Sequence, residues 1–171
     1  HKWLCSFEGC GIFYCRRAHL ERLRPVLVGW NSVMKNHEFE SYDPRFPAEA
    51  RKFEEGSLPL VAIFALQKAL ELFAEITVSE AERLALEAAG HVRSGIVPRG
   101  LLDLSQRGPG GPSPIVIVGG DFGVLETYEK LTKEGVQLAP RGGGLRLSPH
   151  FYNTQADAGR FWEIFDRVRA S

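Results

Sequence analysis

The chain has 171 residues, of which 44% are hydrophobic and 25% charged, with 21 basic and 21 acidic side chains. This is the composition of an ordinary soluble globular protein, and it excludes collagen-like and disordered classes. The balanced charge provides no basic field to attract a nucleic acid, so no nucleic-acid partner is expected. The longest apolar stretch, residues 58–66, is about half of what a membrane-spanning helix needs, so we expect no membrane association.

Three cysteines, Cys5, Cys10 and Cys15, lie close together near the N-terminus. An odd count does not suit the disulfide framework of a secreted domain, and no secretory leader is visible, so we expect reduced thiols and a cytoplasmic location. Their spacing lacks a fourth ligand and matches no zinc or iron–sulfur pattern, so no metal is expected. Because the chain starts at His1 and enters an apolar stretch directly, we expect it to be a fragment.

The first third of the chain contains few regular elements. Residues 11–15, rich in aromatic and β-branched side chains, predict a buried strand, and residues 16–24 predict a short helix. Residues 29–55 contain asparagines and prolines without a lasting period and predict a long loop. A loop of this length usually lines a site or an interface.

Two helices are predicted next. Ser57 is a favourable N-cap for the first, and apolar side chains surround most of that helix, so it must be covered on several sides. The second begins at Ser79, which has capping-box spacing with Glu82, and runs towards Val92.

The last part of the chain alternates between strands and helices. A turn at 108–114 precedes a strand at 114–118, a helix at 122–134, strands at 136–139 and 144–148, and a final helix that begins with the capping-box pair Thr154 and Asp157. This order predicts a small α/β or α+β unit.

Several short motifs point to one family of enzymes. They are His1-Lys2-Trp3-Leu4, Gly9-Cys10-Gly11-Ile12-Phe13, and the segments 51–57, 141–148 and 149–154. In this order and spacing they resemble the C-terminal half of class V aminotransferases, which are pyridoxal-phosphate enzymes of fold type I. The family includes cysteine desulfurases, selenocysteine lyases and isopenicillin N epimerase, and the resemblance covers nearly the whole chain.

The resemblance implies a fold and a domain organisation. Residues 1–56 would be the end of a large α/β domain that binds pyridoxal 5'-phosphate, residues 57–76 a linking helix, and residues 77–171 the small C-terminal α+β domain. It also implies a homodimer and an amino-acid substrate.

The resemblance assigns the central role to Lys2, whose amine would form the Schiff base with the cofactor aldehyde and then move the substrate's α-proton. His1 would contact the cofactor phosphate, although a tag or cleavage remnant explains this histidine equally well. The remaining lysines resemble ordinary surface charges: Lys35, Lys52, Lys68, Lys130 and Lys133.

Two further sites follow from the resemblance. Gly56 and Ser57 would reach the phosphate of the cofactor bound in the partner subunit, which suits a helix N-terminus, although a plain N-cap explains Ser57 equally well. Arg146 would grip the substrate α-carboxylate with its planar guanidinium, whereas a solvated strand arginine is the alternative. Arg141 is a weaker candidate for anion binding.

Two departures from the family pattern limit the assignment. The loop 139–144 has no cysteine where cysteine desulfurases carry their nucleophile, so desulfuration is not expected. The second departure concerns residues that the family places before the lysine. They are its ring-stacking residue, its acidic partner for the pyridine nitrogen and its main phosphate loop, and we expect this chain to lack them. Transamination, epimerisation and β-elimination remain open, and the rival hypothesis is a non-catalytic module that keeps the small-domain fold and a dimer or partner surface.

Overall fold

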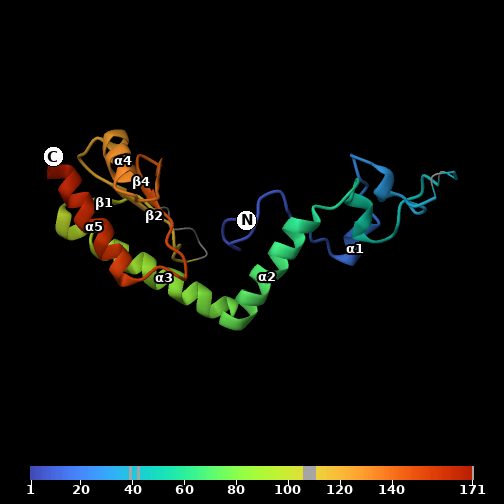
Figure 1. Ribbon diagram of the computed structural model, residues 1–171, viewed down its shortest axis with the longest axis horizontal. Coiled ribbons are helices and arrows are strands. Elements are labelled where there is room, and N and C mark those ends of the chain that lie inside the picture. Colours follow the sequence, from blue (N-terminus) through green and yellow to red (C-terminus); the bar gives the residue numbers. More distant parts are fainter. Residues whose placement is uncertain (39, 42, 106–110, 171) are drawn as a thin grey trace. The chain divides into compact units, whose positions relative to one another are not determined.

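The computed structural model describes residues 1–38, 40–41, 43–105 and 111–170 (Figure 1). The chain divides into two compact units, His1–Glu71 and Leu72–Ser171, each of which is described by itself. Within the described residues, the helices are too short or too polar to pass through a bilayer.

The first unit is mostly irregular. Its regular elements are α1 (Arg17–Leu20), the 3-10 turns η1 (Trp30–Ser32) and η2 (Ala50–Phe53), and the first part of α2 (Leu60–Ile76). Over its described residues the predicted loop at 29–55 is therefore confirmed apart from these two short turns, whereas the helix predicted at 16–24 is reduced to a single turn.

The strand predicted at 11–15 is wrong. A strand needs a neighbour for its backbone groups, and no described segment pairs with these residues. Their side chains are correspondingly exposed, with Ile12 at 69% and Tyr14 at 80%.

Both predicted helix starts need correction. The first helix begins at Leu60, three residues after Ser57, so Ser57 is not its N-cap. The second, α3 (Val78–Ser94), is capped by Thr77 instead of Ser79, because the Thr77 hydroxyl accepts a hydrogen bond from the Glu80 amide at 3.2 Å. The capping threonine lies one residue after α2 ends, so the two helices are joined without a loop.

The second unit combines three long helices with a four-stranded sheet. Its elements after α3 are η3 (Val97–Arg99), β1 (Leu102–Asp103), β2 (Val116–Gly119), α4 (Val124–Lys133), β3 (Ala139–Arg141), β4 (Gly144–Leu147) and α5 (Gln155–Ala170). The sheet is antiparallel throughout, in the order β1-β2-β4-β3. This arrangement confirms the predicted mixed fold and makes the unit α+β.

The predicted strands and helices of this unit occur in the predicted order, but some of their boundaries differ. Strand β1 was not predicted, and the strand expected at 136–139 lies instead at Ala139–Arg141. Of the turn predicted at 108–114, residues 108–110 lie outside the described residues, and residues 111–114 belong to no helix or strand. The final capping box is confirmed: the Thr154 amide donates to Asp157 Oδ2 at 2.8 Å, and the Asp157 amide donates to Thr154 Oγ1 at 3.4 Å.

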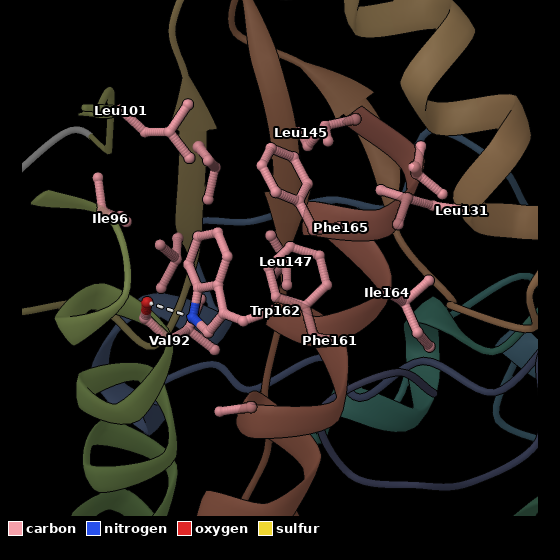
Figure 2. Close-up of a cluster of buried hydrophobic side chains, with 14 of the residues drawn as sticks. Val92, Ile96, Leu101, Leu131, Leu145, Leu147, Phe161, Trp162, Ile164 and Phe165 are labelled. Carbon is pink, nitrogen blue, oxygen red and sulfur yellow. Dashed lines mark hydrogen bonds between the residues drawn. The ribbon is translucent and has the colours of Figure 1, made fainter. Parts of the chain in front are cut away.

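The core of this unit lies on one face of the sheet. Val116 and Val118 of β2, and Leu145 and Leu147 of β4, point towards α3, α4 and α5. Trp162 of α5 donates its indole N–H to the Val92 carbonyl of α3 at 3.2 Å, and Figure 2 shows this bond within the cluster. Because the helices occupy this face, the side chains that alternate with the core point to the other one.

Candidate functional site

The terminal residues form a tight turn. The Ser6 amide donates to the His1 carbonyl at 3.0 Å and the Cys5 amide to the Lys2 carbonyl at 3.2 Å, while Cys5 itself has a left-handed φ of 51°. The Lys2 side chain is exposed, and His1 Nε2 lies 3.6 Å from Glu8 Oε1. A pocket of about 280 Å³ beside the turn is lined by His1, Leu4, Ser6, Phe7, Cys10, Gly11, Ile12 and Leu66.

Gly56 and Ser57 follow a loop that is held by hydrogen bonds. Asn31 Nδ2 donates to the Gly56 carbonyl at 3.4 Å, and the Asn31 amide donates to the Glu55 carbonyl at 3.3 Å. Arg51 in turn donates to the Asn31 carbonyl at 2.8 Å. The segment around residue 31 therefore fixes the backbone that leads into Gly56, while the Ser57 side chain is exposed.

Two small residues allow this close backbone contact. A Cβ atom at Gly29 would lie 1.9 Å from the Glu55 carbonyl oxygen, so only glycine fits there. Ser32 is fully buried, donates to the Glu54 carbonyl at 3.0 Å and accepts from the Gly29 amide at 3.3 Å. Gly56 and Ser57 thus directly follow a loop segment that hydrogen bonds hold in place. They precede helix α2 and do not cap it.

Lys52 is not the surface charge that the sequence predicts. Its side chain is buried, at 6% exposure, and its ammonium donates to the Leu20 carbonyl. It also lies 5.4 Å from the centre of the Phe53 ring. Lys52 therefore joins α1 to the loop, whereas Lys2 makes no side-chain hydrogen bond or ion pair within the described residues.

Arg146 lies on the face of the sheet opposite the helices. The register places it beside Ile117 of β2 and Ala139 of β3, while its neighbours Leu145 and Leu147 are in the core. The arginine is half-buried. Its Nε atom is fully buried and has no hydrogen-bond partner among the residues that the structure describes.

A buried N–H group without a partner costs free energy and is rare in folded proteins. No carboxylate within the described ranges pairs with this guanidinium. The half-buried guanidinium of Arg146 is therefore not neutralised within the described residues, and a carboxylate is the anion with which an arginine forms two parallel hydrogen bonds.

The acid of the far edge strand, Asp103 of β1, faces the other way. The register pairs Asp103 with Val118, a core residue, and Asp103 Oδ2 accepts from Arg93 Nε of α3 at 3.3 Å. Partial burial alone would raise the pKa of this carboxyl. Hydrogen bonds from Ser105 and the positive charge of Arg93 outweigh that effect and hold the pKa below its usual value.

The hairpin before Arg146 is as short as a hairpin can be. Arg141 pairs with Gly144, so Gly142 and Gly143 alone form the turn, with φ of 62° and 78°. Positive φ at both central residues is typical of a type I′ turn, which glycine allows without strain. The three cysteines, all free, lie in the first unit and not in this hairpin.

The five predicted site residues thus occupy three local structures. His1 and Lys2 lie in the terminal turn and Gly56 and Ser57 at the end of the braced loop, and no hydrogen bond or ion pair among the described residues joins these pairs. Arg146 belongs to the second unit. Sequence reasoning missed the supporting residues Asn31, Ser32 and Arg51, because their hydrogen bonds join segments that are distant in the sequence.

Comparison with known proteins gives a consistent family. Residues 1–161 match the family model described as Aminotransferase class-V. Among curated proteins, the uncharacterized aminotransferase YcbU of Bacillus subtilis is 27% identical over 156 residues, which are 91% of this chain and 40% of that protein.

Solved structures share the fold. The cysteine desulfurase CsdA of Escherichia coli matches with a TM-score of 0.81 and 21% identity over 98% of this chain and 44% of that one. A mutant of C-DES, whose structure holds glycine linked covalently to its pyridoxal-phosphate cofactor, matches with a TM-score of 0.84 and 17% identity over 97% of this chain and 44% of that one. The chain spans less than half the length of each of these relatives.

Proposed function

The chain belongs to the aminotransferase class-V family, and on this basis we propose that the whole protein is a pyridoxal-phosphate enzyme that acts on an amino acid. In this proposal residues 1–56 complete the cofactor-binding domain, residues 57–76 form the linking helix, and residues 77–171 form the small domain. The observation that carries the proposal is the half-buried Arg146, which forms no ion pair among the described residues and lies on the sheet face that the helices leave open.

Arg146 binds the α-carboxylate of the substrate in this proposal. Its guanidinium would donate two parallel hydrogen bonds to the two carboxylate oxygens, which orients the substrate. Fixing the carboxylate also limits the positions that the α-carbon can take. A residue with this geometry therefore contributes to positioning as well as to affinity.

The residues present fit the aldehyde end and the phosphate end of the cofactor. Lys2 supplies an exposed amine that makes no ion pair within the described residues, and its Nζ would hold the aldehyde carbon and move a proton to and from the substrate α-carbon. His1 would contact the phosphate. The cofactor, when bound, supplies the electron sink that makes this α-proton acidic enough to remove.

Gly56 and Ser57 would serve the cofactor of a second subunit in a homodimer. The exposed Ser57 hydroxyl can donate to a phosphate, and the hydrogen bond from Asn31 to the Gly56 carbonyl holds the half-buried backbone bend beside it in place. The apolar side chains at the start of α2 support a protein interface nearby, since Leu60, Val61 and Phe64 are each more than 60% exposed. In a dimer, loop 29–55 would lie close to the two-fold axis.

We propose further that the reaction is not a cysteine desulfuration. The two-residue turn Gly142–Gly143 offers neither a cysteine nor a loop long enough to carry one to the substrate. Besides the cofactor, transamination, epimerisation and elimination need a positioned carboxylate and a proton-transferring amine, and in the proposal these roles fall to Arg146 and Lys2.

The experiment uses the full-length protein. We expect visible absorbance from the bound cofactor, and a spectral change on adding amino acids but not on adding the matching amines that lack a carboxylate. Arg146→Lys keeps the positive charge but cannot form two parallel hydrogen bonds with a carboxylate. It should weaken the apparent affinity for amino acids in this spectral assay about ten- to a hundredfold, while cofactor absorbance is retained. A full-length protein without bound cofactor would instead support the non-catalytic module.

A further inference from the structure

Two arginines share the open face of the sheet. In the register, Ala139 pairs with Arg146 and Arg141 pairs with Gly144, so the side chains of Arg141 and Arg146 lie on one face, on adjacent strands. Such diagonal neighbours are about 7 to 8 Å apart, within reach of long side chains. Arg141 is exposed at the end of the sheet, whereas Arg146 is half-buried.

No acid of the sheet balances this pair. Asp103, on the far edge strand, faces the helices and pairs with Arg93. Neither Arg141 nor Arg146 forms an ion pair within the part of the chain that the structure describes. The open face of the sheet is therefore positively charged, although the chain as a whole has a net charge of +0.

The space beside the two arginines is apolar. Ile117 lies over the hairpin glycines, since a Cβ at Gly142 would lie 3.1 Å from its Cδ1. Leu104 covers Gly119 in the same way, with its Cδ1 2.3 Å from the position of such a Cβ. A short aliphatic chain can lie on these side chains while its ends reach the arginines.

We propose that Arg141 binds a second anionic group, at the side-chain end of the substrate, so that the enzyme prefers amino acids that carry a side-chain carboxylate or another oxyanion. The proposal rests on the function proposed above, in which Arg146 takes the α-carboxylate. The fit follows from the distance between the two strands: one arginine on each strand suits two anionic groups separated by a few carbon atoms. Arg141 is then a specificity residue, and it takes no part in proton transfer.

The test compares substrates that differ only in that charge. With the full-length enzyme, kcat/KM is measured for glutamate against glutamine and for aspartate against asparagine, with O-phosphoserine against serine to separate a phosphate from a carboxylate. Binding of glutarate and butyrate, which lack the amino group, is measured by calorimetry. The variants are Arg141→Gln, Arg141→Lys and, as a control on the helix side of the unit, the exposed Arg160→Gln.

We expect Arg141→Gln to lower kcat/KM for the anionic substrates, and the affinity for glutarate, about ten- to a hundredfold, and to change the values for glutamine and butyrate less than twofold. Arg141→Lys should retain part of the preference, and Arg160→Gln all of it. An equal loss for charged and neutral substrates, or no loss for either, would overturn the proposal. If Arg146→Lys still weakens every amino acid in that case, the proposed function stands and only the role of Arg141 falls.

Discussion

Replacing Arg146 by methionine should make the protein more stable while removing its substrate binding. The aliphatic stem of methionine can lie where the arginine stem lies, next to Ile117 and Ala139, so packing is largely kept. What is removed is the buried Nε–H, which has no partner among the described residues. A buried donor without a partner costs about 1 to 3 kcal/mol, and because the arginine is only half-buried we expect a gain at the lower end.

The assay is urea unfolding of the full-length protein without substrate, at one protein concentration because the stability of the proposed dimer would depend on it. We expect Arg146→Met to raise the free energy of unfolding by about 1 kcal/mol. The matched control, Arg141→Met, removes an exposed arginine and should change it by less than about 0.5 kcal/mol. If Arg146→Met is instead destabilising by more than about 1 kcal/mol, the Nε has a partner in the whole protein and the carboxylate assignment loses its support.

Three further predictions concern the fold of the second unit. Thr154→Ala removes the cap of α5 and should lower the free energy of unfolding by about 1 kcal/mol in urea, whereas the exposed Thr132→Ala in α4 should change it little. Hydrogen bonds from the Thr154 amide and hydroxyl hold the pKa of Asp157 below its usual 3.8, so the stability that this carboxylate contributes is present above pH 3.8 and is lost as the pH falls through the lowered value. The difference in stability between wild type and Asp157→Asn should therefore shrink on acidification, and a constant difference would contradict the assignment. Trp162→Phe should cost about 1 kcal/mol for the hydrogen bond to Val92, and no change in its unfolding curve would show that this bond does not form.

The second unit was largely predictable because its signals are local. The capping pair Thr154–Asp157 fixes the start of α5, and the alternation around Arg146 fixes which side of β4 is in the core. The strand predicted at 136–139 was misplaced because a local pattern does not determine strand pairing. Val136 and Leu138 do pack on the core, but the glycine turn at 142–143 sets the register, so the residues that pair with β4 are Ala139–Arg141.

The first unit was less predictable because its order depends on contacts between distant residues. Neither the packing of Gly29 against Glu55 nor the burial of Lys52 against the Leu20 carbonyl leaves a periodic signal. The prediction of a strand at 11–15 is wrong because a high β propensity does not by itself provide a neighbouring strand to pair with. The sequence shows that Lys2 and Ser57 are polar, but only the resemblance to a family assigned these residues a role.

The most direct test of the central claim is to find which lysine holds the cofactor. The full-length protein is reduced with borohydride, digested, and the modified peptide identified by mass spectrometry, with Lys2→Ala as the control. The account predicts a cofactor-modified peptide containing Lys2 in the wild type and no such peptide in the variant. Modification of another lysine, such as the buried Lys52, or a reduced protein without any modified lysine, would contradict it.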